Sequence, residues 1–121
     1  QAEDGIRYAQ ESRRLGDVYK RQAKHNGFDW DFLGGADLWR QYKPSRAVYL
    51  GIARLMQVEP SDVLMVATHA SDLDAARACG LRTAYIERPR EWGAVHKDET
   101  PNPLDDFRAT GFDDLADQLG C

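Results

Sequence analysis

Apolar residues fall into short runs and helical stripes from residue 45 to the end of the chain. A helix is predicted from about Ser45 to Met56, because apolar residues recur there at i, i+4, i+7 and i+8 and prolines stand on both sides of the segment. The stripe consists of Val48, Ile52, Leu55 and Met56. The apolar run from Val63 to Ala67 is short and bounded by turn signals, which predicts a strand covered on both faces.

A second helix and a second strand follow this pair. Ser71 is predicted to cap a helix that runs to Cys79 and ends at Gly80, since glycine favours the left-handed conformation common at helix C-termini. Thr83 to Ile86 is predicted to be another short buried strand. The charged, proline-rich stretch from Arg88 to Pro103 is predicted to be a loop.

Shorter elements are expected toward the two ends of the chain. A brief strand near Phe107 and a helix from Phe112 to Leu119 complete the pattern. Near the start, Gly27 is predicted to end a short helical stretch, and the aromatic segment from Phe28 to Leu33 to form a strand before two glycines. Residues 1–22 are mostly polar and predict at best a poorly anchored helix.

Alternating strands and helices predict an α/β fold with a parallel sheet flanked by helices and joined by right-handed crossovers. In such sheets the chemistry lies at the carboxyl ends of the strands. Those ends are residues 68–72 and residues 87–90. We therefore expect the functional site to be built from these two segments.

Composition narrows the classes of protein. The chain has 121 residues, of which 42% are apolar and 30% charged, and this suits one folded domain. The net charge of -4 disfavours a nucleic-acid partner, because binding phosphates needs a basic face. No apolar run approaches the roughly 18 residues that span a bilayer, and no secretory leader opens the chain. We expect a cytoplasmic protein with neither a nucleic-acid nor a membrane partner.

The cysteines and the acids add little chemistry of their own. Cys79 and Cys121 lack the spacing of a metal or redox pair, so we expect a small core residue and an exposed thiol. From Asp98 onward seven acids stand against the single Arg108. That excess predicts a solvated face rather than an acidic docking surface.

Three groups of residues could carry chemistry: Lys43, residues 68–72 and residues 88–93. Lys43 stands before a predicted helix, where the helix dipole disfavours a cation, so an anion that needs the lysine would explain its position. Chance exposure, the commoner case for any single lysine, is the alternative. His69 and Asp72 have a spacing that would suit two metal ligands, but no further ligand is near and we expect no metal. A purely structural role, with Asp72 as a helix cap and His69 as a turn residue, remains the alternative.

From Ala23 to Gly120 the chain resembles the C-terminal half of a haloacid dehalogenase superfamily hydrolase, and in particular a type II (S)-2-haloacid dehalogenase. Lys43-Pro44 resembles the third motif of the superfamily, and the segment VATHASD at residues 66–72 resembles the fourth. The loop from Arg88 to Gly93 is similar to the same branch. The resemblance implies a Rossmann-like core.

The resemblance also implies an activity and roles for site residues. In these enzymes an aspartate displaces halide from the α-carbon of a short 2-halo carboxylic acid, and water hydrolyses the resulting ester. Lys43 would pair with that aspartate and keep it ionised. Tyr49 would help frame the substrate pocket, and Thr68 and His69 would hydrogen-bond around the nucleophile. Asp72 would hold Lys43 and help to position the water.

Two departures from the superfamily pattern shape these expectations. Thr68 stands where phosphatases of the superfamily carry a magnesium-binding aspartate, which implies that no metal cofactor is used. The nucleophile motif and the second motif have no counterpart in residues 1–22, where residues 16–22 look like a junction peptide. We therefore expect residues 23–121 to be the C-terminal part of the core, without the N-terminal strand and cap, and this chain alone to be an inactive fragment.

Two other functions stay open. A superfamily phosphatase would require magnesium, and a Rossmann-like binding module would have no catalytic role. The dehalogenase hypothesis names a small 2-halo acid as the partner and is compatible with a homodimer, although the sequence leaves the oligomeric state open.

Overall fold

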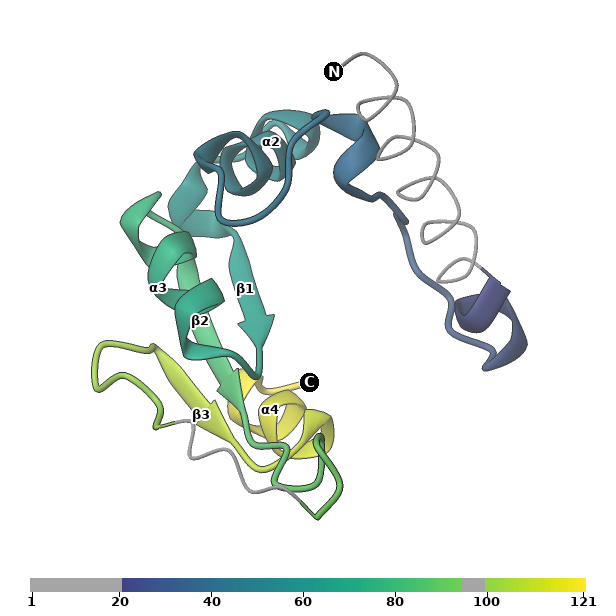
Figure 1. Ribbon diagram of the computed structural model, residues 1–121, viewed down its shortest axis with the longest axis vertical. Coiled ribbons are helices and arrows are strands. Elements are labelled where there is room, and N and C mark those ends of the chain that lie inside the picture. Colours follow the sequence, from purple (N-terminus) through teal and green to yellow (C-terminus); the bar gives the residue numbers. More distant parts are fainter. Residues whose placement is uncertain (1–20, 95–99) are drawn as a thin grey trace. The chain divides into compact units, whose positions relative to one another are not determined.

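The computed structural model describes residues 21–94 and 100–121 (Figure 1). The chain divides into two compact units, Gln1–Tyr42 and Lys43–Cys121. Most of the segment predicted to be a poorly anchored helix, residues 1–20, lies outside the described residues, as do residues 95–99 of the predicted loop.

The described part of the first unit contains little regular structure. A helical turn at residues 21–25 leads to Gly27, whose φ of 70° is the left-handed conformation predicted there. The strand predicted from Phe28 to Leu33 is wrong: this segment is irregular, and a 3-10 helix, η1 (Ala36–Leu38), follows it. A strand needs a hydrogen-bonding neighbour, and none is present within residues 21–42. Phe28 and Trp30 are each more than half exposed.

A parallel sheet forms the centre of the second unit. Its strands are β1 (Leu64–Ala67), β2 (Arg82–Ile86) and β3 (Phe107–Ala109), in the order β1-β2-β3. Val66 pairs with Ala84 and Ala84 with Phe107, so the three strands end at the same edge (Figure 1). This arrangement confirms the α/β fold, the three strands and their parallel pairing.

The predicted helices of the second unit are present as α2 (Arg46–Met56), α3 (Ala70–Ala78) and α4 (Phe112–Leu119), with a 3-10 turn, η2 (Pro60–Asp62), before β1. Gly80 has a φ of 88° just after α3, as predicted. The cap predicted at Ser71 is wrong, because Ser71 lies inside α3 and His69 occupies the N-cap position without a side-chain capping bond. Asp72 makes no cap either.

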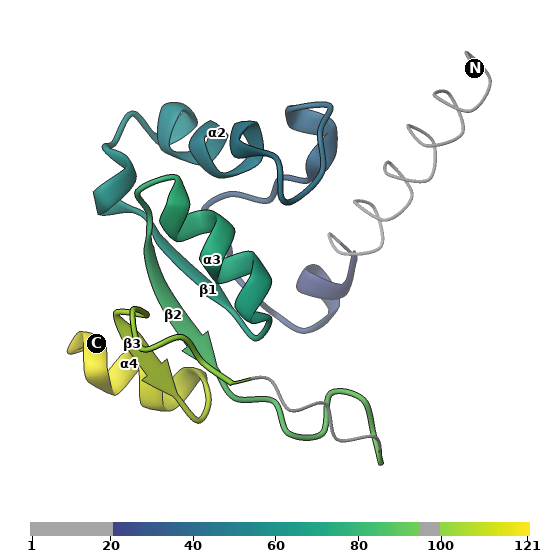
Figure 2. The same cartoon turned by 60° about the vertical axis from the view of Figure 1, so that its left-hand side comes forward.

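Helices α3 and α4 cover opposite faces of the sheet (Figure 2). On β1 the side chain of Met65 packs in one apolar cluster with α3, whereas its neighbours Leu64 and Val66 pack in another with α4. Successive side chains of a strand point to opposite faces, so the two clusters are the two layers of the core. Cys79 is buried in the first layer and Cys121 is exposed, as expected.

One prediction of burial needs correction. All four residues of β1 are only partly buried, because within the described residues its outer edge pairs with no strand. On α2 the core-facing residues are Tyr49 and Ala53, whereas Leu55 and Met56 from the predicted apolar stripe are about half exposed.

The acidic C-terminal stretch is more than a solvated face. The Asp105 side chain is 2% exposed and forms an ion pair of 2.7 Å with Arg77 on α3. Its carboxylate also accepts hydrogen bonds from the Thr83 hydroxyl and from the Asn102 backbone N–H. This acid therefore joins the segment before β3 to β2 and α3.

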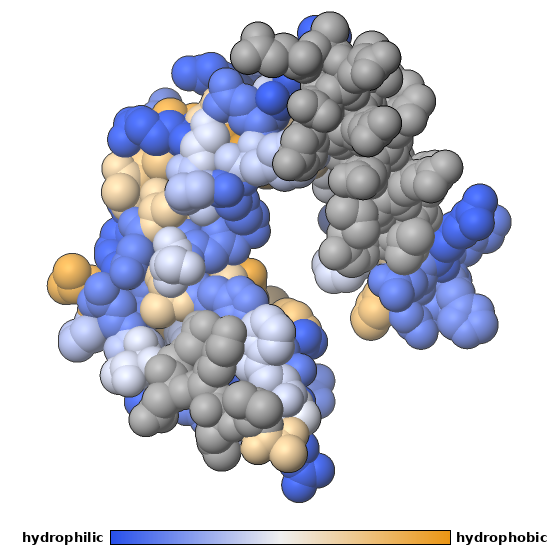
Figure 3. Space-filling model, viewed as in Figure 1, coloured by the Kyte–Doolittle hydropathy of each residue, from blue (hydrophilic) through white to orange (hydrophobic). Residues whose placement is uncertain are grey.

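The surface around the second unit is largely polar, with hydrophobic residues scattered over the face drawn in Figure 3. Among the described residues, no helix combines the length and the apolar character that crossing a membrane requires.

Candidate active site

The carboxyl ends of β1 and β2 are joined by a side chain. The Thr68 hydroxyl, one residue beyond β1, donates a hydrogen bond of 3.0 Å to the carbonyl oxygen of Ile86, the last residue of β2. The connections that leave the two strands therefore begin side by side, as the sheet topology predicts.

Lys43, Tyr49 and Asp72 meet beside this edge of the sheet. Lys43 precedes α2, and its Nζ lies 2.5 Å from Oδ2 of Asp72 in the first turn of α3. The Tyr49 hydroxyl, from α2, donates a hydrogen bond of 2.6 Å to the other oxygen, Oδ1. Asp72 is thus the anion that explains a lysine at an electrostatically unfavourable position.

One side of this cluster is buried and the other is exposed to solvent. Tyr49 is 2% exposed, while the side chains of Asp72 and Lys43 are 16% and 52% exposed. Burial, reinforced by the hydrogen bond to the Asp72 carboxylate, raises the pKa of Tyr49 far above the usual value. Tyr49 therefore remains a hydrogen-bond donor at any ordinary pH, and Asp72 has one buried neutral partner and one exposed cationic partner.

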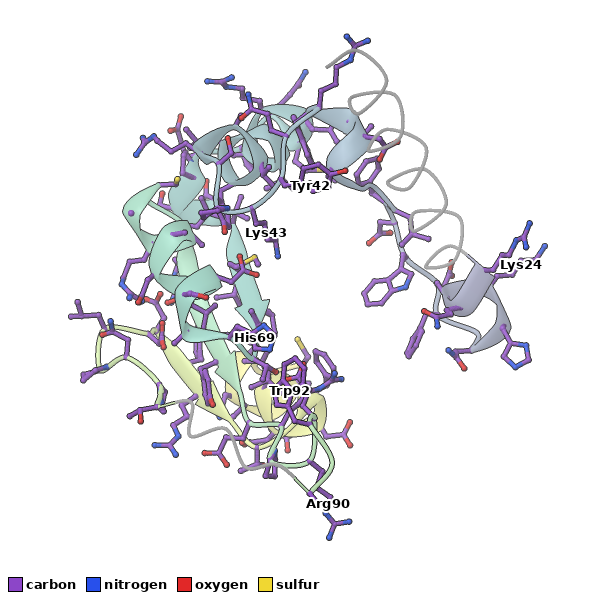
Figure 4. All side chains as sticks on the ribbon, viewed as in Figure 1. Lys24, Tyr42, Lys43, His69, Arg90 and Trp92 are labelled. Carbon is purple, nitrogen blue, oxygen red and sulfur yellow. The ribbon has the colours of Figure 1, made fainter. Side chains whose placement is uncertain are left out.

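His69 forms a second cluster with the loop that follows β2. Its Nε2 lies 3.0 Å from Oε2 of Glu91, and its ring stacks on that of Trp92 with centroids 6.3 Å apart. Figure 4 shows His69 and Trp92 side by side beyond the end of β1, with Arg90 directed away from them. The loop of residues 88–93 is therefore attached to the β1–α3 connection.

A pocket of about 250 Å³ opens at these strand ends. Its lining combines apolar side chains with a few polar ones, as is common in sites for small molecules. The lining residues are Val66, Ala67, Thr68, His69, Ile86, Arg88, Glu91 and Phe112.

The structure brings the predicted site residues into two adjacent groups. Lys43, Tyr49 and Asp72 form the first, and Thr68 and His69 belong to the pocket. Tyr49 does not line that pocket; its hydroxyl is bound to Asp72 instead. Sequence reasoning missed the contact of Glu91 with His69, although the position of Glu91 just after a strand end marked its loop as a candidate.

Potential metal ligands are not grouped in the described part of the chain. Residues 21–94 and 100–121 contain no group of three or more His, Cys, Asp or Glu side chains placed to hold a metal ion. At the position where a carboxylate would be needed, the Thr68 hydroxyl is used in the bond to β2.

Fold and site define an α/β protein with polar groups gathered where parallel strands end, and relatives of known structure have the same architecture. An L-2-haloacid dehalogenase is 43% identical with a TM-score of 0.77, over 81% of this chain and 42% of that chain. A defluorinating L-2-haloacid dehalogenase is 42% identical with a TM-score of 0.78, over 82% of this chain and 41% of that chain.

A curated relative belongs to a different branch of activity. Phosphoglycolate phosphatase 1 of Pseudomonas aeruginosa is 31% identical over 94 residues, which are 78% of this chain and 31% of that protein. No protein-family model matches the chain. The chain thus spans less than half the length of each of these relatives.

On this fold and this likeness, the chain belongs to the haloacid dehalogenase superfamily of hydrolases. The family resemblance seen in the motifs around Lys43 and Asp72 is therefore confirmed.

Proposed function

We propose that this chain supplies the lysine and aspartate of an active site that removes halide from short 2-halo carboxylic acids. The observation that carries the proposal is the Lys43–Asp72 ion pair, backed by the Tyr49 hydroxyl, in a chain that is 43% identical to an L-2-haloacid dehalogenase over the matched segment. A fixed ammonium group is what an ionised carboxylate nucleophile needs beside it.

The proposed reaction proceeds in two steps. An aspartate carboxylate attacks the α-carbon, the carbon–halogen bond breaks and halide leaves with the bonding electrons. Water then attacks the carbonyl of the aspartyl ester, giving the 2-hydroxy acid, a proton and the free aspartate. The motif that would hold this nucleophile has no counterpart in residues 1–22, so we propose that another segment supplies it and expect the 121-residue chain alone to be inactive.

Lys43 and Asp72 divide the work in this scheme. An ammonium group has three N–H donors, and in the described structure one of them is directed at Asp72. The others are available to the nucleophile, whose charge Lys43 would stabilise. Asp72, held by Tyr49, would fix the lysine and help to orient the hydrolytic water, while Thr68 and His69 would hydrogen-bond around the reacting groups.

The reaction is proposed to need no metal. Magnesium prefers carboxylate oxygens, whereas this chain offers the Thr68 hydroxyl at the corresponding place and engages it in the bond to Ile86. Activity should therefore survive a chelator.

A chimera tests the proposal. In the dehalogenase that is 43% identical, the segment that matches this chain is replaced by the chain's own residues. We expect the chimera to release halide from chloroacetate or 2-chloropropionate without added metal. Lys43→Met should lower the rate by about 100-fold or more, because it removes a positioned charge from the reacting centre. Lys24→Met, the same change far along the sequence, is the matched control.

Two results would contradict the proposal. One is a folded chimera, by circular dichroism, that releases no halide. The other is a Lys43→Met variant that keeps the rate of the parent.

The second candidate is a phosphatase, favoured by the relative that hydrolyses a phosphate ester by name, phosphoglycolate phosphatase 1. It predicts turnover of phosphate monoesters by the chimera that depends on added magnesium. A phosphatase screen with and without the metal separates the two functions. A folded chimera inactive in both assays, and a 121-residue chain that is monodisperse by light scattering, would favour a binding module.

A further inference from the structure

The contact between His69 and Glu91 has no role in the two-step reaction proposed above. Both residues line the strand-end pocket, and they come from different connections, one after β1 and one after β2. Their polar atoms are 3.0 Å apart, and their side chains are 44% and 27% exposed. Because both side chains line the pocket, their contact restricts how a bound molecule can be placed there.

The loop presents Glu91 through its own backbone turns. The N–H of Glu91 donates to the carbonyl of Arg88, and the N–H of Gly93 donates to that of Arg90. Gly93 has a φ of 67°, a conformation that side chains other than glycine rarely adopt. These turns aim the Glu91 carboxylate back toward the end of β1.

The chemistry of the pair fixes the position of one proton. An ionised carboxylate can only accept hydrogen bonds, so the His69 nitrogen that faces it must carry a hydrogen. In a neutral imidazole the other nitrogen is then an acceptor. Within the described residues, Nδ1 of His69 makes no hydrogen bond, so its lone pair is available to a molecule in the pocket.

Trp92 restrains the ring itself. Its indole lies nearly parallel to the imidazole, at an interplanar angle of 19° (Figure 4). A stacked neighbour restricts rotation about the side-chain bonds, whereas the hydrogen bond alone sets only one atom. Two independent contacts from adjacent residues of one loop therefore hold His69.

We propose that Glu91 is a positioning residue that keeps the proton of His69 on Nε2, and that Trp92 holds the ring so that Nδ1 accepts a hydrogen bond from a donor in the pocket. Any contribution of this Glu91–His69–Trp92 arrangement to halide release rests on the proposed function. The state of the imidazole does not, and it can be measured on the 121-residue chain.

The test follows the imidazole nitrogens of the chain labelled with ¹⁵N-histidine, in long-range proton–nitrogen spectra at about pH 8.5, above the ordinary titration range of histidine. The chain has three histidines, and His69→Gln identifies the signals of interest. We expect the Nε2–H form to dominate. In Glu91→Ala the ratio of Nε2–H to Nδ1–H should fall by about fivefold, the size of effect expected for a half-exposed charge-assisted contact.

Two further variants guard the interpretation. Glu87→Ala removes a carboxylate that pairs with Arg108 rather than with His69, and it should leave the ratio unchanged. Glu91→Gln keeps a carbonyl oxygen that can accept from Nε2–H, so it should restore most of the wild-type ratio. The Trp92 indole N–H signal should shift in Glu91→Ala and not in Glu87→Ala.

The proposal is overturned if His69 is mainly the Nδ1–H form in the wild-type chain. It is also overturned if Glu91→Ala, with a dispersed spectrum of a folded chain, leaves both the ratio and the Trp92 signal as they were. Neither result depends on whether the chimera releases halide, so failure of this inference and failure of the proposed function remain distinguishable.

Discussion

Asp72 has two partners that make different demands on its carboxylate. Lys43 is exposed and charged, while Tyr49 is buried and neutral. The contact with the lysine is screened by water and is worth little on its own. The contact with the tyrosine lies in the core, where a hydrogen bond lost from one partner leaves the other without its donor.

Replacing Tyr49 by Phe therefore tests what holds Asp72. The ring still fills the core, so the loss should come from the hydroxyl alone, about 1 kcal/mol of unfolding free energy. Urea denaturation measures it. In an Asp72→Asn background the same substitution should cost clearly less, because the charged acceptor is already gone. Equal costs in the two backgrounds would show that Tyr49 and Asp72 are not coupled.

At the scale of residues, the sequence was better at identifying the site residues than at predicting which of them contact each other. Lys43 could be named because its position before a helix favours a nearby anion, whereas Asp72 as its partner was implied only by the family resemblance; the structure pairs the two. Glu91 could not be assigned to His69, because their contact depends on how a loop 22 residues farther along folds back. The spacing of residues along the sequence does not predict such a long-range contact.

Among the elements, α3 depends on polar contacts at its C-terminal end as well as on its apolar face. Arg77, in its last turn, pairs with Asp105 and with Asp74. Asp105 is almost fully buried and also accepts from Thr83 at the start of β2. This acid therefore couples a helix and a strand to the segment that enters β3.

Asp105→Asn should be one of the more damaging single changes in the chain. It removes the charge that a mostly buried Arg77 requires, and breaking a buried pair costs about 3 kcal/mol. Glu87→Gln makes the same chemical change in the exposed pair with Arg108 and should cost less than about 1 kcal/mol. Denaturant unfolding of both variants gives the comparison. Similar losses for the two would mean that Asp105 is not a buried anchor.

Helix α4 predicts a dependence of stability on pH. Asp114, in its first turn, accepts a hydrogen bond of 2.9 Å from the Thr110 backbone N–H, and that bond, with help from Gln118, lowers the pKa of Asp114. A folded-state pKa below the unfolded one gives stability that is present above the ordinary pKa near 4 and is lost as pH falls through the lowered value.

Asp114→Asn should therefore melt below the wild-type chain at pH 7, and the gap between their melting temperatures should narrow as pH falls below about 4. Thermal scans by circular dichroism across this range measure it. Asp113→Asn, in the same turn, separates this specific bond from the general effect of a charge near the helix dipole. A gap that is constant with pH would contradict the assignment.

The helices and strands were well predicted where the apolar pattern agreed with the prolines and glycines that bound each segment. The strands before and after α3 and the helix from Phe112 to Leu119 appear where expected. The predicted strand at residues 28–33 is absent. Residues with high β-propensity form a strand only where they can join a sheet, and the described residues of this unit contain no sheet.

At the scale of the whole chain, the second unit contains both apolar clusters of the core. Tyr49, Ala76 and Leu81 form one, and Ala84, Ala109 and Leu115 contribute to the other. The contacts of Lys43, Tyr49 and His69 described above also join residues of this unit. In the described part of the first unit, by contrast, most of the large aromatic residues are exposed.

A shortened chain of residues 41–121 should therefore keep the fold and the site. Because its core and its ion pairs are internal to the second unit, we expect cooperative thermal unfolding with a midpoint close to that of the whole chain. The His69 and Trp92 signals should also be unchanged, since the contacts of His69 with Glu91 and with Trp92 are retained. Leu73→Ala, which empties a position of 0% exposure in the core, should abolish or strongly lower the transition, at a cost of about 3 kcal/mol. If the shortened chain melts without a cooperative transition, residues 1–40 contribute contacts on which the sheet depends, and the two units are not separate folding entities.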